Sequence, residues 1–388
     1  MVHLLLALIY LSFISLGLPD GLLGAAWPSM YGELSAPVSA AGVIFIIISA
    51  GTVASSLLSE RLNLKLGPGK VTAFSVAMTA VALLGFASCT SLWQLCLWAV
   101  PYGLGAGSVD ACLNNYVALH YASRHMSWLH CMWGIGASIG PYIMGAVLTS
   151  GGHWSRGYQL IGLIQLVLTA VLLLSLPLWK KSASGTDEGS HKPLSLRQVS
   201  RIPGVKAMLL SFFCYCATEQ TVGLWAGSYL VLNRGMAAEL AASFAGLFYM
   251  GIALGRALNG FFTLKFTDTR LTQAGFCIIL LGIAAVLLPL GNTAALIGLG
   301  LIGLGCAPIY PSIIHATPER FGAERSQAVI GVLMASAYLG NCLMPPIFGL
   351  IANHISISLL PLYLLLILAL MAAMHQLALR RCGNNKTC

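Results

Sequence analysis

Charged side chains are scarce in this chain of 388 residues. Asp, Glu, Lys and Arg together make up 8% of it, whereas about a quarter of the residues in a typical soluble domain are charged. Acids are the scarcer sign, with 11 Asp and Glu against 20 Lys and Arg, which gives a formal net charge of +9. This composition excludes a soluble globular protein.

Residue sets typical of catalysis and of metal binding are also missing. The sequence contains no recognisable nucleophile–base set, and Cys214 and Cys216 have no second pair of ligands nearby that would indicate zinc. Most of the eleven cysteines fall inside apolar segments, where a thiol behaves as a small hydrophobic group. We therefore expect no enzyme activity, no cofactor, no metal and no structural disulfide.

Apolar runs are what the sequence has in abundance. Hydrophobic residues make up 58% of the chain, and a membrane-spanning helix needs about 20 consecutive, mostly apolar residues. Twelve such segments are separated by short polar turns, at 3–27, 38–60, 70–88, 92–117, 127–149, 158–179, 205–231, 240–264, 270–290, 293–315, 326–352 and 356–379. The prediction is an all-α membrane protein with twelve transmembrane helices.

The distribution of the basic residues predicts how these helices are oriented. Lys and Arg in short loops are retained on the cytoplasmic side of a membrane, and one set of alternate loops contains seventeen of the twenty. The opposite loops contain Arg156 and Arg234, while Arg256 lies inside a predicted helix. We expect a multi-pass protein of the cell membrane with both termini in the cytoplasm. The asymmetry also accounts for the positive charge, so no nucleic-acid partner is expected.

One long polar stretch divides the helices into two sets of six. Residues 180–204, KKSASGTDEGSHKPLSLRQVSRIPG, have the Ser, Gly, Pro and charged composition of a flexible linker. The predicted organisation is an N-terminal six-helix bundle at 1–180, a cytoplasmic linker at 181–203, a C-terminal six-helix bundle at 204–380 and a cytoplasmic tail at 381–388.

The two sets of helices carry matching residues at an offset close to 200. Gly51 corresponds to Gly251, and GLGAGSVD from residue 103 corresponds to GLGCAPIY from residue 303. Glycines inside spans let helices pack closely in lipid, whereas GLGAG lacks the preceding strand that a phosphate-binding loop requires. The repeat resembles the parallel six-helix repeats of the major facilitator superfamily, in which the substrate cavity lies between the halves.

Three acids and one arginine lie inside predicted helices, away from the helix termini. Asp20, Asp110 and Glu219 lie in the first, fourth and seventh spans, and Arg256 lies toward the cytoplasmic end of the eighth, where it fits a gating latch better than a cavity residue. A charge at membrane depth costs about 2.5 kcal/mol or more, so it normally faces a polar cavity or a partner. With three acids to one base, at least two acids must be protonated or satisfied by polar ligands. We predict that the acids take part in proton coupling; for each, the alternative is a packing hydrogen bond or a pairing with a basic neighbour.

Polar and aromatic side chains near these acids are candidates for substrate binding. Asn114 lies one turn from Asp110 on the same helix face, so a carboxylate and a carboxamide can hold a polyhydroxylated ligand together. Aromatic rings suit the C–H faces of a sugar, and for His130 a packed, hydrogen-bonded ring is an equal alternative. The predicted substrate-binding residues are Asp110, Asn114, His130, Glu219, Gln220, Trp225, Tyr229, Tyr310, Tyr338 and Asn341.

These residues give the chain a closer resemblance to the fucose permease group of the superfamily, which includes the fucose:proton symporter and sodium–glucose transporter-like proteins. PDGLLGAAWPSM around Asp20 resembles the first-helix pattern of that group, and Asp110 with Asn114 matches its fourth-helix pattern of an acid, three residues and Asn. His130 and Glu219 stand at polar positions of its fifth and seventh helices. The resemblance implies that Asp20 couples protons and that Asp110, shorter than the usual Glu, binds sugar and proton.

The resulting hypothesis is a monomeric secondary transporter that takes up a hexose or a related polar metabolite with protons, by alternating access of two rigid halves. The runner-up is a proton-driven exporter of drugs or lipophilic metabolites on the same fold. Many aromatic and Met residues would suit that exporter, but the acid and amide of the fourth helix fit it less well. The short loops disfavour a receptor or sensor.

Overall fold

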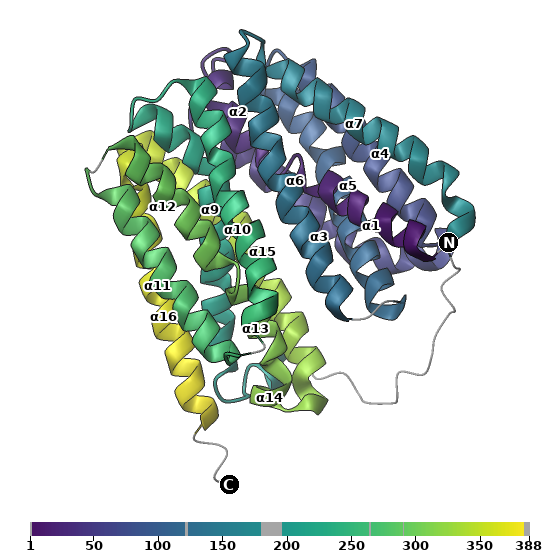
Figure 1. The fold of residues 1–388 in the computed structure, drawn as a ribbon, viewed down its shortest axis with the longest axis vertical. Coiled ribbons are helices and arrows are strands. Elements are labelled where there is room, and N and C mark those ends of the chain that lie inside the picture. Colours follow the sequence, from purple (N-terminus) through teal and green to yellow (C-terminus); the bar gives the residue numbers. More distant parts are fainter. Residues whose placement is uncertain (1, 121–122, 180–195, 264, 290, 384–388) are drawn as a thin grey trace.

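The computed structural model describes residues 2–120, 123–179, 196–263, 265–289 and 291–383, and in these ranges every regular element is a helix (Figure 1). Each of the twelve predicted spans coincides with helical structure, and two spans are each divided into two helices. The helices of the spans are α1 (Val2–Gly17), α2 (Leu22–Met30), α3 (Ala40–Leu66), α4 (Pro68–Ala87), α5 (Leu92–His120), α6 (Ser123–Thr149), α7 (Trp154–Leu174), α9 (Val205–Leu232), α10 (Ala238–Phe262), α11 (Asp268–Leu287), α12 (Asn292–Cys306), α13 (Ile309–His315), α15 (Ala323–Ile351) and α16 (Leu360–Gly383). Short elements complete the chain: η1 (Leu176–Leu178), α8 (Leu196–Val199), α14 (Thr317–Phe321), η2 (Ala352–Ser356) and η3 (Ile357–Leu359).

The helices form two groups that repeat the same contacts. The N-terminal group consists of α1–α7. Within it, α5 packs against α3 and α4, α4 packs against α7, and α1 packs against α6. In the C-terminal group, α9–α16, α10 and α11 both pack against α12, α11 packs against α16, and α9 packs against α15. Span by span, each pair in one group has its counterpart in the other, so the repeat read from the sequence is present in the packing. Figure 1 shows the two groups side by side.

Repeat-related glycines occupy equivalent helix contacts. A β-carbon at Gly103 would lie 2.2 Å from the Ile48 carbonyl oxygen of α3, and one at Gly303 would lie 1.9 Å from the Phe248 carbonyl oxygen of α10. Only a residue without a side chain allows backbones to approach this closely. The predicted packing role of the GLGAG and GLGC segments is therefore confirmed.

The first span, expected as one helix over 3–27, is broken between α1 and α2 at residues 18–21. Pro19 has no backbone N–H and so cannot donate to the carbonyl of Ser15 four residues earlier. The side chain of Gln165 on α7 donates to that carbonyl instead, over 2.8 Å. The break is thus compensated by a neighbouring helix, as irregular backbone at membrane depth requires.

Replacing Gln165 with Leu is expected to destabilise the protein by about 1–3 kcal/mol, because the buried Ser15 carbonyl loses its donor. The Gln165 side chain is 1% exposed, and its Oε1 also accepts a hydrogen bond from Thr79. The measurement is the melting temperature in detergent. Leu166→Ala, at an exposed position of the same helix, is the control, and an equal fall in both variants would contradict the assigned role.

Other predicted boundaries also shift. The tenth span, expected over 293–315, is divided between α12 and α13 near Pro308, which again cannot donate a helical hydrogen bond. Most of the predicted linker at 181–203 lies outside the described residues, although α8 occupies part of the remainder. The predicted tail at 381–388 begins as the last turn of α16, and its other residues lie outside the described part of the chain.

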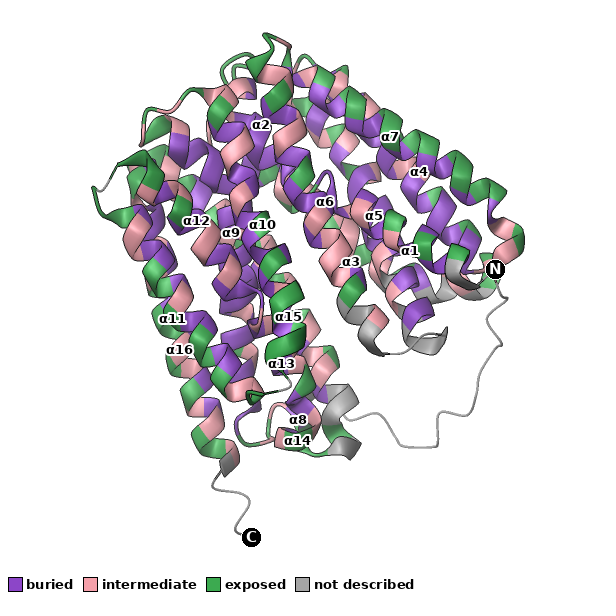
Figure 2. Cartoon of the chain, viewed as in Figure 1, coloured by how far each residue is buried: buried purple, intermediate pink, exposed green. Residues whose placement is uncertain are grey.

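Apolar side chains cover the outward-facing surfaces of the helices. Val167 and Leu174 on α7 are 66% and 82% exposed, and Leu366 on α16 is 72% exposed. Figure 2 shows exposed residues along the outer faces of α7, α11 and α16. Within the described residues, eight stretches are long and apolar enough to cross a membrane, and the last of them, Val329–Cys382, contains both α15 and α16. Such extensive apolar exposure is expected of a surface that contacts lipid.

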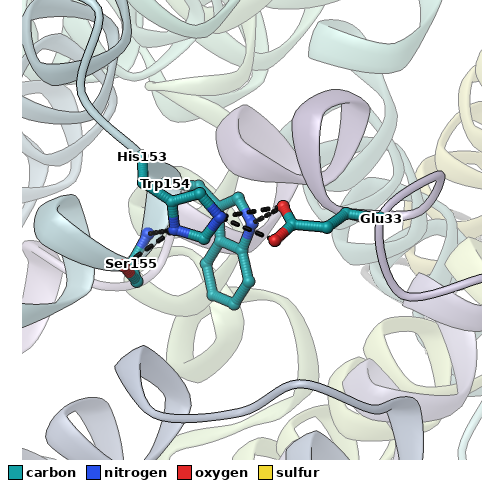
Figure 3. A network of polar contacts seen from close by, with 4 residues as sticks. All are labelled: Glu33, His153, Trp154 and Ser155. Carbon is teal, nitrogen blue, oxygen red and sulfur yellow. Dashed lines mark hydrogen bonds and ion pairs between the residues drawn. The ribbon is translucent and has the colours of Figure 1, made fainter.

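A polar cluster joins the segment that follows α2 to the segment that precedes α7. The Glu33 carboxylate, just after α2, lies 2.7 Å from His153 Nε2 and accepts a hydrogen bond from Trp154 Nε1 over 2.6 Å (Figure 3). Partial burial would raise the pKa of Glu33, but these hydrogen bonds outweigh it and lower that pKa below its usual range. The stabilisation is therefore present at neutral pH and is lost as the pH falls through the lowered pKa.

Candidate functional site

A cavity of about 770 Å³ lies between the two groups of helices. Both groups contribute to its wall, the N-terminal group chiefly through α1–α6 and the C-terminal group through α9, α10, α13 and α15. At one end the wall reaches Thr263, Asp268 and His315, and the His315 side chain is 83% exposed. The cavity is therefore open at this end, and its volume suits a small molecule.

The opposite end is closed by backbones in close contact. A β-carbon at Gly24 on α2 would lie 2.3 Å from the Gly223 carbonyl oxygen of α9, and one at Gly227 would lie 2.6 Å from the Gly24 carbonyl oxygen. A β-carbon at Gly145 on α6 would lie 2.7 Å from the backbone nitrogen of Ser243 on α10. Because side chains would not fit in these contacts, glycine lets the two groups meet. We call this the closed end.

Asp20 stands in the break between α1 and α2, and its side chain is exposed to the cavity. Its Oδ2 accepts a hydrogen bond from Trp133 Nε1 over 2.6 Å, and the Tyr102 side chain lies beside this carboxylate. Within the part of the chain that the structure describes, no basic side chain forms an ion pair with Asp20, so this carboxylate is able to exchange a proton with the cavity.

Asp110 on α5 lines the cavity, and Asn114 holds it in place. Asn114 Nδ2 donates to Asp110 Oδ1 over 2.9 Å and to the Asp110 carbonyl oxygen over 3.0 Å. The predicted shared helix face is therefore present. Asn114 itself, which was predicted to bind substrate, does not lie on the described wall, and its amide is bound to Asp110.

Glu219 on α9 is 8% exposed and pairs with polar groups of its own helix group. The Tyr215 hydroxyl donates to Glu219 Oε2, and Arg256 Nη2 on α10 lies 3.9 Å from the same oxygen. Arg256 Cζ also lies 5.0 Å from the ring centroid of Trp133. Arg256, which was expected to fit a gating latch better than a cavity residue, therefore lies on the cavity wall, where an acid and an aromatic ring stabilise its guanidinium. Its gating role stays a prediction.

The remaining predicted residues that reach the cavity come from four helices. His130 on α6 packs edge-on against Phe13 and lies 6.4 Å from the Tyr310 ring, centroid to centroid. Gln220, Tyr310, Tyr338 and Asn341 also line the wall. The Tyr310 hydroxyl points to the sulfur of Met334 over 3.3 Å. Amide, hydroxyl and aromatic groups thus surround the three carboxylates.

Trp225 and Tyr229, which were predicted to bind substrate, do not lie on the described wall of the cavity. They are 0% and 2% exposed. Trp225 Nε1 donates to the Pro345 carbonyl and the Tyr229 hydroxyl to the Val286 carbonyl. Six residues along a helix turn a side chain by about 240°, so a residue that far beyond Glu219 faces the interior of the C-terminal group.

Replacing Trp225 with Phe is therefore expected to lower the stability of the protein by about 1 kcal/mol, the usual net value of one buried hydrogen bond, and to leave ligand affinity unchanged. Melting temperature and ligand affinity, measured on the same purified protein, separate these effects. Tyr310→Phe, on the cavity wall, is the comparison that should alter affinity. A weakened affinity in Trp225→Phe alone would restore this residue to the site.

The sequence interpretation missed several residues that complete the site. Trp133 and Tyr215 contact the acids directly, and Tyr102 lies beside Asp20. Two of the three were detectable, because Tyr215 precedes Glu219 by four residues and Trp133 follows His130 by three, both spacings that share a helix face. Tyr102 has no such signal, since it meets Asp20 only through the packing of α5 near the break.

Comparison with known families identifies the architecture. The model of the Major Facilitator Superfamily matches residues 9–299. A solved structure of a bacterial homologue of the human lysosomal transporter Spinster, in an inward-facing and occupied conformation, superposes with a TM-score of 0.76 at 13% sequence identity, covering 98% of this chain and 97% of that chain. This likeness supports the fold alone.

Three curated relatives match most of this chain. Bypass of stop codon protein 6 of Saccharomyces cerevisiae is 23% identical, covering 92% of this chain and 79% of the relative. The glucose/mannose transporter of Bacillus subtilis is 21% identical, covering 90% and 88%. The sodium-dependent glucose transporter 1 of Homo sapiens is 20% identical, covering 88% and 72%. Two of the three are sugar transporters by name.

Proposed function

This chain belongs to the major facilitator superfamily, and from that premise we propose that it is a proton-coupled secondary transporter of a hexose or a related polar metabolite. The membership makes it a transporter and not an enzyme. The observation that carries the finer proposal is the position of Asp20, Asp110 and Glu219 on the wall of one cavity between the two helix groups.

The chemistry of the wall supports a polar, neutral substrate. Asp110, Gln220 and Asn341 offer carboxylate and amide groups that bind hydroxyls, and His130 and Tyr310 offer rings beside them. Two relatives with similar sequences are named as glucose transporters. Asp110, oriented by Asn114, is the proposed sugar anchor, and replacing it with Ala should abolish saturable binding.

The balance of charge supports proton coupling. Four acids lie on the described wall. Asp268, at the open end, pairs with His315, whereas Asp20, Asp110 and Glu219 lie deeper, with Arg256 beside Glu219. Asp20 and Asp110 are held by uncharged donors, Trp133 and Asn114. A carboxylate without a counter-charge at membrane depth gains from protonation or from a polar ligand, and this suits Asp20 as the main proton site.

Alternating access would be performed by two rigid bundles, residues 1–180 and 204–380, joined by the linker at 181–203. The open end of the cavity lies on the same side as the basic residues Lys265, Arg270 and Arg320, which the distribution of charge assigns to the cytoplasm. On this assignment both termini are cytoplasmic, the protein lies in the cell membrane, and the conformation is open inward.

The test is uptake of labelled monosaccharides, beginning with D-glucose and D-mannose, into proteoliposomes under imposed pH and sodium gradients. We expect accumulation driven by an inside-alkaline pH gradient and abolished by a protonophore, with protein carrying Asp110→Ala as the inactive control. Accumulation driven by a sodium gradient alone would show that sodium, and not the proton, is the coupling ion. No uptake of any monosaccharide, together with a rise in melting temperature with hydrophobic cations, would favour the exporter.

A further inference from the structure

Trp133 on α6 contacts charged groups of both helix groups. Its indole Nε1 donates to Asp20 Oδ2 over 2.6 Å, while its ring centroid lies 5.0 Å from Cζ of Arg256 on α10. Arg256 in turn lies 3.9 Å from Glu219 of α9. One side chain therefore connects the acid in the break of the first span to the ion pair of the opposite group.

Trp133 and Asp20 are held together within the N-terminal group. A β-carbon at Gly17, the last residue of α1, would lie 2.1 Å from the Trp133 carbonyl oxygen, and one at Gly136 would lie 1.9 Å from the Ile14 carbonyl oxygen. These contacts fix the backbone of α6 against α1 at Trp133 and three residues after it. The indole–carboxylate hydrogen bond is therefore internal to one rigid group.

The contact between Trp133 and Arg256 crosses from one group to the other. Tyr249, about two helical turns before Arg256 on α10, also packs edge-on against Trp133, with ring centroids 6.3 Å apart. If the groups rock about the cavity, contacts within a group persist and contacts between groups change. The indole–guanidinium contact is thus specific to the conformation in which the closed end is closed.

The negative charge of Asp20 strengthens the contact between Trp133 and Arg256. A carboxylate that accepts the indole N–H polarises the ring, which strengthens its attraction for a cation on its face. The carboxylate also attracts the guanidinium through space in a site of low dielectric constant. Protonation of Asp20 removes both attractions, so Arg256 is held less firmly against the N-terminal group.

We propose that Trp133 is a positioning residue that transmits the charge state of Asp20 to Arg256, and thereby to the stability of the closed end. The inference rests on the proposed function, because it describes how proton binding in one half changes the preferred orientation of the other. A ligand shifts a conformational equilibrium only through a difference in interaction between the states. The Trp133–Arg256 contact is such a difference.

The test is hydrogen–deuterium exchange of the purified full-length protein in lipid nanodiscs, which needs no substrate. The readout is the exchange rate of peptides that contain Gly24 of α2 and Gly223 of α9, the backbones that meet at the closed end. Trp133→Phe keeps an aromatic ring and removes the N–H donor. We expect exchange there to be about threefold faster than in the unmodified protein at pH 7, because a phenyl ring without the indole hydrogen bond attracts the guanidinium less strongly than the indole does.

Matched variants separate this role from simple packing. Asp20→Asn and Arg256→Gln should each accelerate exchange at the closed end, and Asp20→Asn combined with Trp133→Phe should add little, because both act on one chain of contacts. Trp128→Phe, at an exposed position on the same helix, should exchange like the unmodified protein. Peptides of α4 and α11, which take no part in the glycine contacts of the closed end, should be unaffected in every variant.

Three results would overturn the proposal. They are unchanged exchange at the closed end in Trp133→Phe, additive effects in the double variant, and acceleration spread over the whole protein. The proposed function fails by a different result, which is the absence of monosaccharide uptake by the unmodified protein. The two failures are therefore distinguishable.

Discussion

Replacing Asp20 with Asn is expected to abolish sugar accumulation driven by a pH gradient, while exchange of labelled for unlabelled sugar across the membrane persists. Asn is close to the protonated carboxyl in shape but cannot release a proton, so transport continues without coupling to the gradient. The Trp133 N–H, which donates to the carboxylate over 2.6 Å, can still donate to the amide oxygen. Accumulation should be lost completely, because proton binding can couple transport to the gradient only by changing the relative stability of the two conformations.

The measurement is made in proteoliposomes, with accumulation under an imposed pH gradient and exchange at equal pH followed in parallel. Glu239→Gln is the control, since this acid lies in the first turn of α10 and not on the described wall of the cavity. It should accumulate sugar normally. Normal accumulation by Asp20→Asn would refute the assignment, and loss of exchange as well would make Asp20 a substrate-binding residue.

Replacing Gly24 with Val is expected to stop net uptake, because the closed end can no longer close. Even a β-carbon at this position would lie 2.3 Å from the Gly223 carbonyl oxygen and 2.8 Å from that of Leu224. Backbone atoms on α9 cannot retreat without separating the two groups. The cavity would therefore stay accessible from the closed side, and the uptake rate should fall at least tenfold.

Uptake into proteoliposomes measures the loss, and exchange of the closed-end peptides measures the conformation. Gly32→Val is the matched control, since no atom lies within 4 Å of a β-carbon there, and its uptake should be normal. Wild-type uptake by Gly24→Val would show that this contact does not gate the cavity. A variant that elutes as aggregate would be replaced by Gly24→Ala, whose smaller side chain still meets the same carbonyl.

Sequence periodicity and composition were sufficient for the helices and for their repetition. The spans at 240–264 and 270–290 correspond to α10 and α11 within a few residues. An apolar segment in lipid forms a helix because a helix satisfies its backbone hydrogen bonds within the segment. The equivalence of Gly103 and Gly303 follows from the same source, since close packing in lipid selects small residues at fixed positions of each repeat. These features depend on the hydrophobicity of each segment and on the positions of its small residues, which the sequence gives directly.

The break at Pro19 shows where that reasoning stops. A run of apolar residues over 3–27 predicts one helix, and proline alone does not decide whether a helix bends, breaks or continues. The break holds because Gln165, about 150 residues away, donates to the carbonyl that proline leaves unpaired. No local pattern connects the two residues.

The sequence by itself determined that the chain crosses the membrane as two related sets of helices and that three acids lie at membrane depth, because hydrophobicity, charge and small-residue spacing are local properties. Only the tertiary structure decided what those acids face. It placed Arg256 beside Glu219 and Trp133 between Asp20 and Arg256, and it turned Trp225 away from the cavity. The rotation of each helix about its axis and the break in the first span set these positions, and both depend on packing between residues far apart in the chain.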